Sequence, residues 1–170
     1  MLSTISMGMV FALPFIFGAL VISAALIIAV ILCGFADSLI ILLSGGIIKL
    51  VNIKVKWRSF SVYSTVLLII GAVVTAASIT MTVFGVNIIS GVGYTGPGLF
   101  VWLYYGIFSI GMVVFAPLGI IGALLEIIYQ RKRKNILKGF SVSLITLASI
   151  AFAITVGIII WLAAVSAGAI

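Results

Sequence analysis

The sequence contains no histidine, one cysteine and only two acidic residues, Asp37 and Glu126. A single cysteine cannot form a disulfide within the chain, and Cys33 lies inside an apolar run where we expect an inert thiol. Catalytic triads, metal clusters and acid–base pairs need histidine, cysteine or carboxylate groups in combination. The sequence therefore predicts no catalytic residues, no metal site and no enzymatic activity.

Charge of either sign is also scarce. Charged residues make up 6% of the chain and hydrophobic residues 65%, whereas a soluble domain carries about 25% charged residues. No charged side chain precedes Asp37, and Glu126 alone interrupts the uncharged stretch 59–130. Such runs exceed the roughly 20 apolar residues that cross a bilayer. We predict an all-α integral membrane protein with about four spans and no separate soluble domain.

The positive charges that are present fall in two short segments. The basic residues are Lys49, Lys54, Lys56, Arg58, Arg131, Lys132, Arg133, Lys134 and Lys138. Both chain ends and the connection 85–98 carry none. The excess of Lys and Arg in cytoplasmic loops predicts that both basic loops lie inside and both termini outside. Because no positive segment precedes the first apolar run, we expect no removable signal peptide.

A short phrase follows each basic loop. Phe-Ser-Val occurs at 60–62 and again at 140–142, and a shift of 80 residues also aligns Lys54 with Lys134. The match predicts a tandem duplication of a helix–basic loop–helix hairpin. Since each unit has an even number of spans, the two copies should be related by an axis near the membrane normal.

The duplication defines the expected organisation. We expect one hairpin over residues 1–90 and a second over 91–170, packed into one compact unit. In this register, superposition of the hairpins should place Phe60 on Phe140.

The first helix of each hairpin is too long for a bilayer. Residues 15–49 and 99–129 would extend beyond about 45 Å, against a hydrocarbon core of about 30 Å. Asp37 and Pro117 are equivalent in the 80-residue register, and Asp is favoured at a helix N-cap and Pro at the first helical position. We therefore predict a helix break or kink at both. Asp37 has a second interpretation, an intramembrane proton or ion site.

The stretch that ends at the second basic loop contains several small residues and one carboxylate. Gly111, Gly119 and Gly122 favour close approach of helices in lipid. Glu126 lies about one turn before the Arg-Lys-Arg-Lys run, so we expect it to pair with a basic loop residue or to reach the membrane interface.

Two hydrophobic hairpins that present basic turns, with nothing else attached, resemble a known architecture. The whole chain is similar in plan to the pilins of conjugation and type IV secretion systems, in particular archaeal DNA-import (Ced-type) pilins. The resemblance carries no diagnostic motif, and the duplication departs from the single hairpin usual in that family. One chain would therefore occupy two pilin positions or form a different assembly.

The resemblance implies a structural role. The chain would be inserted in the membrane first and then assembled into a homo-oligomeric helical filament at the cell surface. Its partners would be other copies, phospholipid, single-stranded DNA in transit, and a secretion-type ATPase with its membrane machinery. No cofactor is implied besides bound phospholipid. The lumen or headgroup contacts implied are Lys54, Lys56, Arg58, Arg131, Lys132, Arg133, Lys134 and Lys138.

Other functions fit the same features. A small accessory subunit of a multi-subunit membrane complex, or a pore-like or transporter-like protein, could have this composition. The basic loops could also serve only to fix topology and to contact anionic headgroups, at about 1 kcal/mol per cation.

Overall fold

The computed structural model describes residues 2–89 and 97–167, which form four long helices. These are α1 (Leu2–Val55), α2 (Arg58–Ile89), α3 (Pro97–Lys132) and α4 (Asn135–Ser166). The described ranges contain no strand, which confirms the predicted all-α class. The expected boundary between residues 90 and 91 lies outside the described residues.

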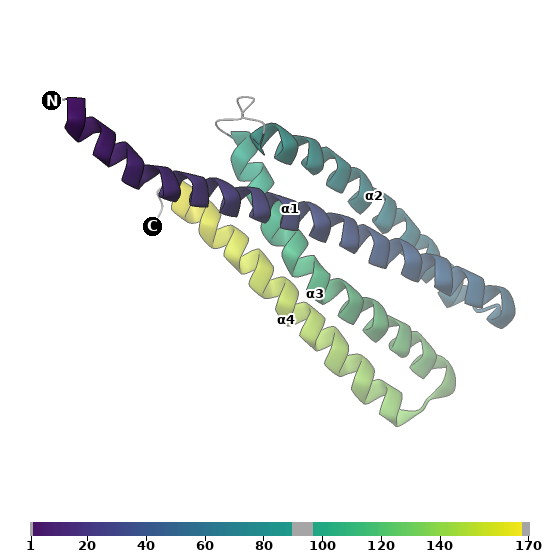
Figure 1. Cartoon of the computed structure of the whole chain (residues 1–170). Coiled ribbons are helices and arrows are strands. Elements are labelled where there is room, and N and C mark those ends of the chain that lie inside the picture. Colours follow the sequence, from purple (N-terminus) through teal and green to yellow (C-terminus); the bar gives the residue numbers. More distant parts are fainter. Residues whose placement is uncertain (1, 90–96, 168–170) are drawn as a thin grey trace.

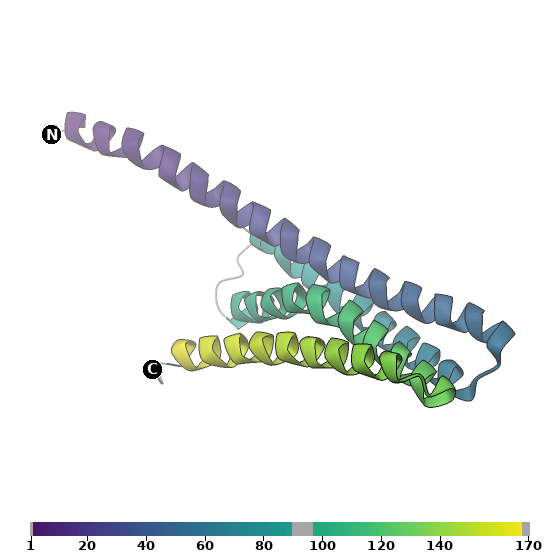
Figure 2. The ribbon, with the colours of Figure 1, turned by 90° about the horizontal axis from the view of Figure 1, so that it is seen from below.

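The helices are arranged as two hairpins. α1 packs along α2 and α3 along α4, while the hairpins meet mainly through α1 and α3, with a smaller contact between α2 and α3. α4 therefore contacts α3 alone among the described helices. Both turns lie at one end of the bundle, and the chain termini lie toward the other (Figure 1). The N-terminal part of α1 projects well beyond the other helices (Figure 2).

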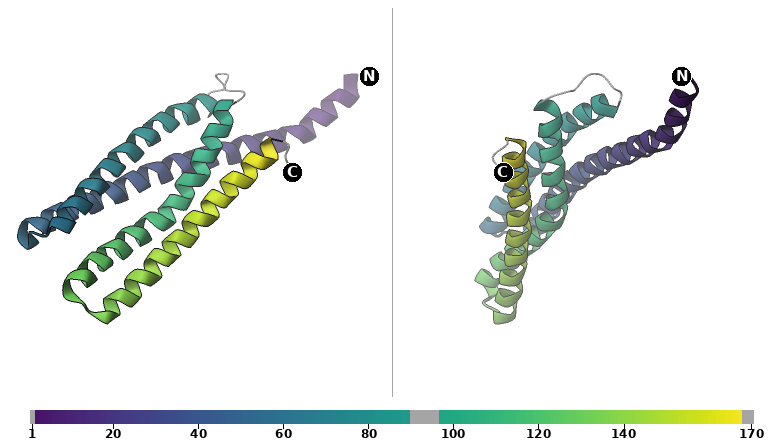
Figure 3. Two further views of the ribbon diagram at one scale, coloured as in Figure 1. Left: turned by 180° about the vertical axis from the view of Figure 1, so that it is seen from behind. Right: turned by 90° about the vertical axis from the view of Figure 1, so that its left-hand side faces the viewer.

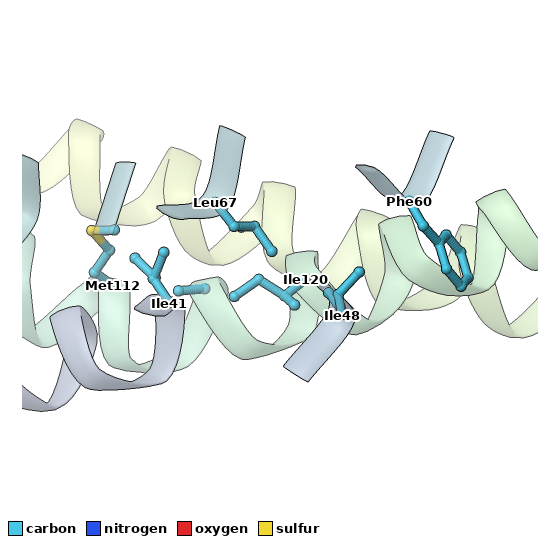
Figure 4. Close-up of a cluster of buried hydrophobic side chains, with 7 residues drawn as sticks. Ile41, Ile48, Phe60, Leu67, Met112 and Ile120 are labelled. Atoms are coloured by element: carbon cyan, nitrogen blue, oxygen red, sulfur yellow. The ribbon is translucent and has the colours of Figure 1, made fainter. Parts of the chain in front are cut away.

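The core is a narrow seam where the first three helices meet. Its buried side chains are Ile41, Ile48, Phe60, Leu67, Met112, Ala116 and Ile120 (Figure 4). α4 joins this seam at its edge, where the rings of Phe115 and Phe152 meet edge to face with centroids 5.2 Å apart. Cys33 is free and half-buried.

The two turns have the same backbone geometry at positions 77 residues apart. Lys56 has φ 53° and Arg133 has φ 49°, both in the left-handed region. Each residue follows the last residue of a helix and donates its N–H to the carbonyl four residues earlier, that of Asn52 (2.8 Å) and of Tyr129 (2.6 Å) respectively. This closure satisfies a carbonyl at the end of the helix.

Contacts between the paired helices repeat with the same spacing. Gly34 approaches Ser78 in the first hairpin, as Gly111 approaches Thr155 in the second. Farther along, Gly45 approaches Leu67 and Leu68, and Gly122 approaches Leu144 and Ile145. The close approach expected from the small residues is thus present at Gly111 and Gly122.

The predicted 80-residue register is therefore wrong for the fold. Phe60 is 5% exposed and belongs to the core, whereas Phe140 is 62% exposed. α2 begins two residues before Phe60, but α4 begins five residues before Phe140. Three residues are less than one helical turn, so the two rings point in different directions. Common origin of the hairpins by duplication stays a prediction.

The predicted helix breaks at Asp37 and Pro117 are also wrong, whereas a kink at these residues stays a prediction. α1 runs without interruption through Asp37, and α3 runs without interruption through Pro117. Asp37 does not cap a helix, because its carboxyl group accepts a hydrogen bond from Ser109 of α3 instead. α3 changes direction along its length but does not end (Figure 3). Within a membrane bundle a helix can continue past proline when its neighbours support the backbone.

Candidate functional site at the basic end

The first basic turn and the last residues of α3 line one cavity. Because both turns lie at the same end of the bundle, the first turn faces the last residues of α3 (Figure 1). A cavity of about 430 Å³ lies between them. It is lined by Lys56, Trp57, Arg58 and Ser59 from the first turn and by Ile127, Gln130 and Arg131 from α3. Cations from both hairpins therefore surround a single space.

Trp57 connects the two hairpins at this site. Its backbone N–H donates to the side-chain oxygen of Asn52 (2.8 Å), which fixes the turn, and its ring lies 4.9 Å from that of Phe60. The guanidinium carbon of Arg131 lies 5.5 Å from the centre of the indole ring. Such a cation–π contact contributes about 0.5–1 kcal/mol at an exposed site. Trp57 thus holds Arg131 of the second hairpin against the first turn.

Each turn places a cation where glycine is usual. The left-handed conformation of Lys56 and Arg133 disfavours residues with a Cβ by about 1 kcal/mol or more. Glycine would adopt this conformation without that penalty. The sequence has a charged side chain at both positions, so both turns retain positive charge despite the conformational cost.

All eight predicted contact residues lie at this end of the bundle, but only some of them line the cavity. Lys56, Arg58 and Arg131 line the cavity. The other five are exposed around it: Lys54, Lys132, Arg133, Lys134 and Lys138. The amine of Lys138 lies 5.9 Å from the centre of the Tyr129 ring.

Glu126 lies near these cations but binds neutral partners. Its Oε2 accepts a hydrogen bond from the Ser141 hydroxyl (2.8 Å), and its Oε1 accepts one from the Gln130 side chain (3.5 Å). The predicted pairing with a basic loop residue is not seen among the described residues. Glu126 instead joins α3 to α4 through its hydrogen bond with Ser141.

Sequence reasoning missed the residues that organise the cavity. Trp57 is visible as an aromatic residue between Lys56 and Arg58, but its contact with Arg131 depends on how the hairpins pack. Asn52 is typical of a helix end, since its side chain readily bonds to nearby backbone. That signal was available in the sequence.

The fold and its surface define a helical integral membrane protein. All four helices have segments long and apolar enough to cross a membrane, and only 11% of the most apolar window is buried within the chain in α1 and in α4. No known protein family, curated protein or solved structure matches this chain.

Proposed function

We propose that this chain is a structural pilin subunit of a conjugation-like DNA-transfer pilus, with its basic turns toward the lumen and lipid headgroups. One observation carries the proposal. Apolar side chains remain uncovered on all four helices, while every basic side chain gathers at one end. The role is structural and not catalytic.

The uncovered apolar surface requires a covering. Large side chains such as Phe15 (80% exposed) on α1 and Ile160 (63% exposed) on α4 are left uncovered by the described part of the chain. A helix that is apolar on all sides is stable only within lipid or against other helices. Lipid covers these faces in the membrane, and neighbouring copies cover them in a filament. α4, which contacts α3 alone among the described helices, leaves a free face for such a neighbour.

The basic end supports the choice of phospholipid as a partner. Stacked copies would bring the cations of successive turns close together, and repulsion is screened only over about 8 Å at physiological salt. Headgroup phosphates in and around the cavity would offset that repulsion, at about 1 kcal/mol per cation. The remaining positive charge would balance the phosphates of single-stranded DNA in transit.

The proposal includes an order of events. The chain is first an integral membrane protein with its basic turns cytoplasmic and its termini outside, and it enters a cell-surface filament through a secretion-type ATPase and membrane machinery. Cysteine labelling in a Cys33→Ser background tests the membrane stage. Probes at Ser90 and Asn135 should be modified from opposite sides. Modification of both from the same side would contradict the four-span arrangement.

Fibres test the final stage. Sheared and washed surface fibres should contain this chain and phospholipid in a fixed ratio, measured by mass spectrometry and quantitative protein analysis. Replacement of Lys56, Arg58 and Arg131 by Gln should lower that ratio, whereas replacement of Lys132, Arg133 and Lys134, which lie outside the cavity, should lower it less. Recovery of the chain only as a minor component of a membrane complex, with its turns bound to another subunit, would identify an accessory subunit instead.

A further inference from the structure

A buried carboxyl group lies between the two hairpins, away from the basic end. Asp37 of α1 is 1% exposed. Its Oδ2 accepts a hydrogen bond from the Ser109 hydroxyl of α3 (3.1 Å), and its Oδ1 has no hydrogen-bond partner among the described residues. Asp37 and Ser109 also line a cavity of about 250 Å³ between α1, α2 and α3. The carboxyl group is therefore only half satisfied.

The described groups that face Asp37 carry no positive charge. α3 presents Ser109 and Tyr105, and the Tyr105 hydroxyl is hydrogen-bonded to Ser78 of α2 (2.7 Å). The residues of α2 that line the cavity are Val73, Val74 and Ala77, and α4 makes no contact with α1. The nearest basic residue on α1, Lys49, is 12 positions away, which is about 18 Å along a helix.

An ionised carboxylate in this place would be very unfavourable. Transfer of an unpaired charge from water to an apolar interior costs several kcal/mol even after the protein relaxes. One hydroxyl donor offsets only part of that cost. Buried charges without a partner are therefore neutralised by a bound cation, of which the proton is the simplest.

We propose that Asp37 and Ser109 form a proton-binding site within the apolar part of the bundle. Oδ2 already accepts the hydrogen bond from the Ser109 hydroxyl, so the proton belongs on Oδ1. This site lies within one chain and does not depend on the proposed filament.

Infrared spectroscopy tests the protonation state directly. The chain has only two acidic side chains, so the carbonyl band of a protonated side-chain carboxyl is simple to assign. The purified full chain in lipid vesicles at neutral pH should show this band, and it should shift in heavy water. Asp37→Asn should lose the band, whereas Glu126→Gln should keep it. A band lost in Glu126→Gln and kept in Asp37→Asn would overturn the assignment.

A hydrophobic carbodiimide tests the wild-type chain, so the result does not depend on how a variant folds. The carboxyl proton moves to one nitrogen of the reagent while the carboxyl oxygen bonds to its central carbon. The acyl group then shifts from oxygen to nitrogen and gives a stable N-acylurea. The whole reagent is added and nothing leaves.

The expected product is one adduct per chain, located at Asp37 by peptide mass spectrometry. Its yield should fall as pH rises, because the deprotonated group cannot supply the proton, and a water-soluble carbodiimide should give little adduct. Sodium or potassium at fixed pH should leave the yield unchanged. Protection by either ion would assign the site to a metal cation, and absence of both adduct and infrared band would show an ionised Asp37; each result overturns the proposal.

Discussion

The two hairpins share their turns and their close helix contacts but differ in how their second helices are used. Both second helices pack on the helix before them, yet α2 also contacts α3, whereas α4 contacts α3 alone. The Tyr63 hydroxyl of α2 donates a hydrogen bond to the carbonyl of Ile120 in α3 (3.0 Å). The position 77 residues later in α4 is Phe140, which is exposed and has no hydroxyl group. A few side chains therefore determine that the second helix of the first hairpin contacts the other hairpin, whereas the second helix of the second hairpin does not.

Polar groups differ between the hairpins in the same way. Ser64 of α2 bonds within its own helix, to the carbonyl of Ser61 (2.9 Å). Ser141, 77 residues later, reaches across to Glu126 of α3. The first hairpin uses its buried carboxyl group, Asp37, to contact the second hairpin, whereas the second uses Glu126 internally. The two turns give both hairpins the same backbone geometry, whereas these side-chain contacts determine how each hairpin packs against the other.

The largest expected effect on stability comes from adding a methyl group where the paired helices approach closely in both hairpins. A Cβ at Gly122 would lie 2.8 Å from the Ile145 side chain, and one at Gly45 would lie 3.1 Å from that of Leu68. Gly122→Ala and Gly45→Ala should each lower the free energy of unfolding in detergent by about 1–3 kcal/mol, with Gly122 the more sensitive. Thermal and denaturant unfolding followed by circular dichroism measure this.

Gly46, which follows Gly45, and Gly139, near the start of α4, supply the control. A Cβ at Gly46 or Gly139 would meet nothing within 4 Å. Alanine there should be neutral or should stabilise the helix by up to about 1 kcal/mol, because glycine is a poor helix former. Equal effects at Gly45 and Gly46 would show that the helices do not approach as closely as described.

A smaller effect on stability should distinguish Ser141 from Ser64, the serine at the equivalent position of the first hairpin. Ser141→Ala leaves a half-buried carboxyl oxygen of Glu126 without its donor, so it should lower the free energy of unfolding by about 1–2 kcal/mol. Ser64→Ala removes only a bond within one helix and should cost less than about 0.5 kcal/mol. The quantity to measure is the difference between the unfolding free energies lost in Ser141→Ala and in Ser64→Ala. In a double-mutant cycle, this difference should become smaller when both variants also carry Glu126→Gln. An unchanged difference would argue against the contact between Ser141 and Glu126.

The smallest effect should be equal in the two hairpins. Lys56→Gly and Arg133→Gly relieve a left-handed backbone conformation and should each raise the free energy of unfolding by up to about 1 kcal/mol. Lys54→Gly, placed within the last turn of α1, should lower it instead. Unequal effects at Lys56 and Arg133 would show that the two turns are not equivalent.

The sequence predicts structural features that depend on the composition of long stretches. It does not predict features that depend on contacts between helices. Four apolar helices follow from the scarcity of charge, and the grouping of cations follows from two short basic segments. The register does not follow, because matching letters at Phe60 and Phe140 carry no information on where each helix begins. Likewise Asp37 and Glu126 bind serines that lie 72 and 15 residues away in sequence, and no local pattern marks these partners.

The grouping of all nine basic side chains at one end has an electrical consequence. A membrane potential acts on a charge that crosses it with about 2.3 kcal/mol per 100 mV. Because every cation lies on the same side, the potential acts on all of them in one direction, whichever way the chain faces. Moving the basic end across the bilayer would then involve about 20 kcal/mol per 100 mV. The end without basic side chains has no such barrier, so the membrane potential treats the two ends of the bundle differently.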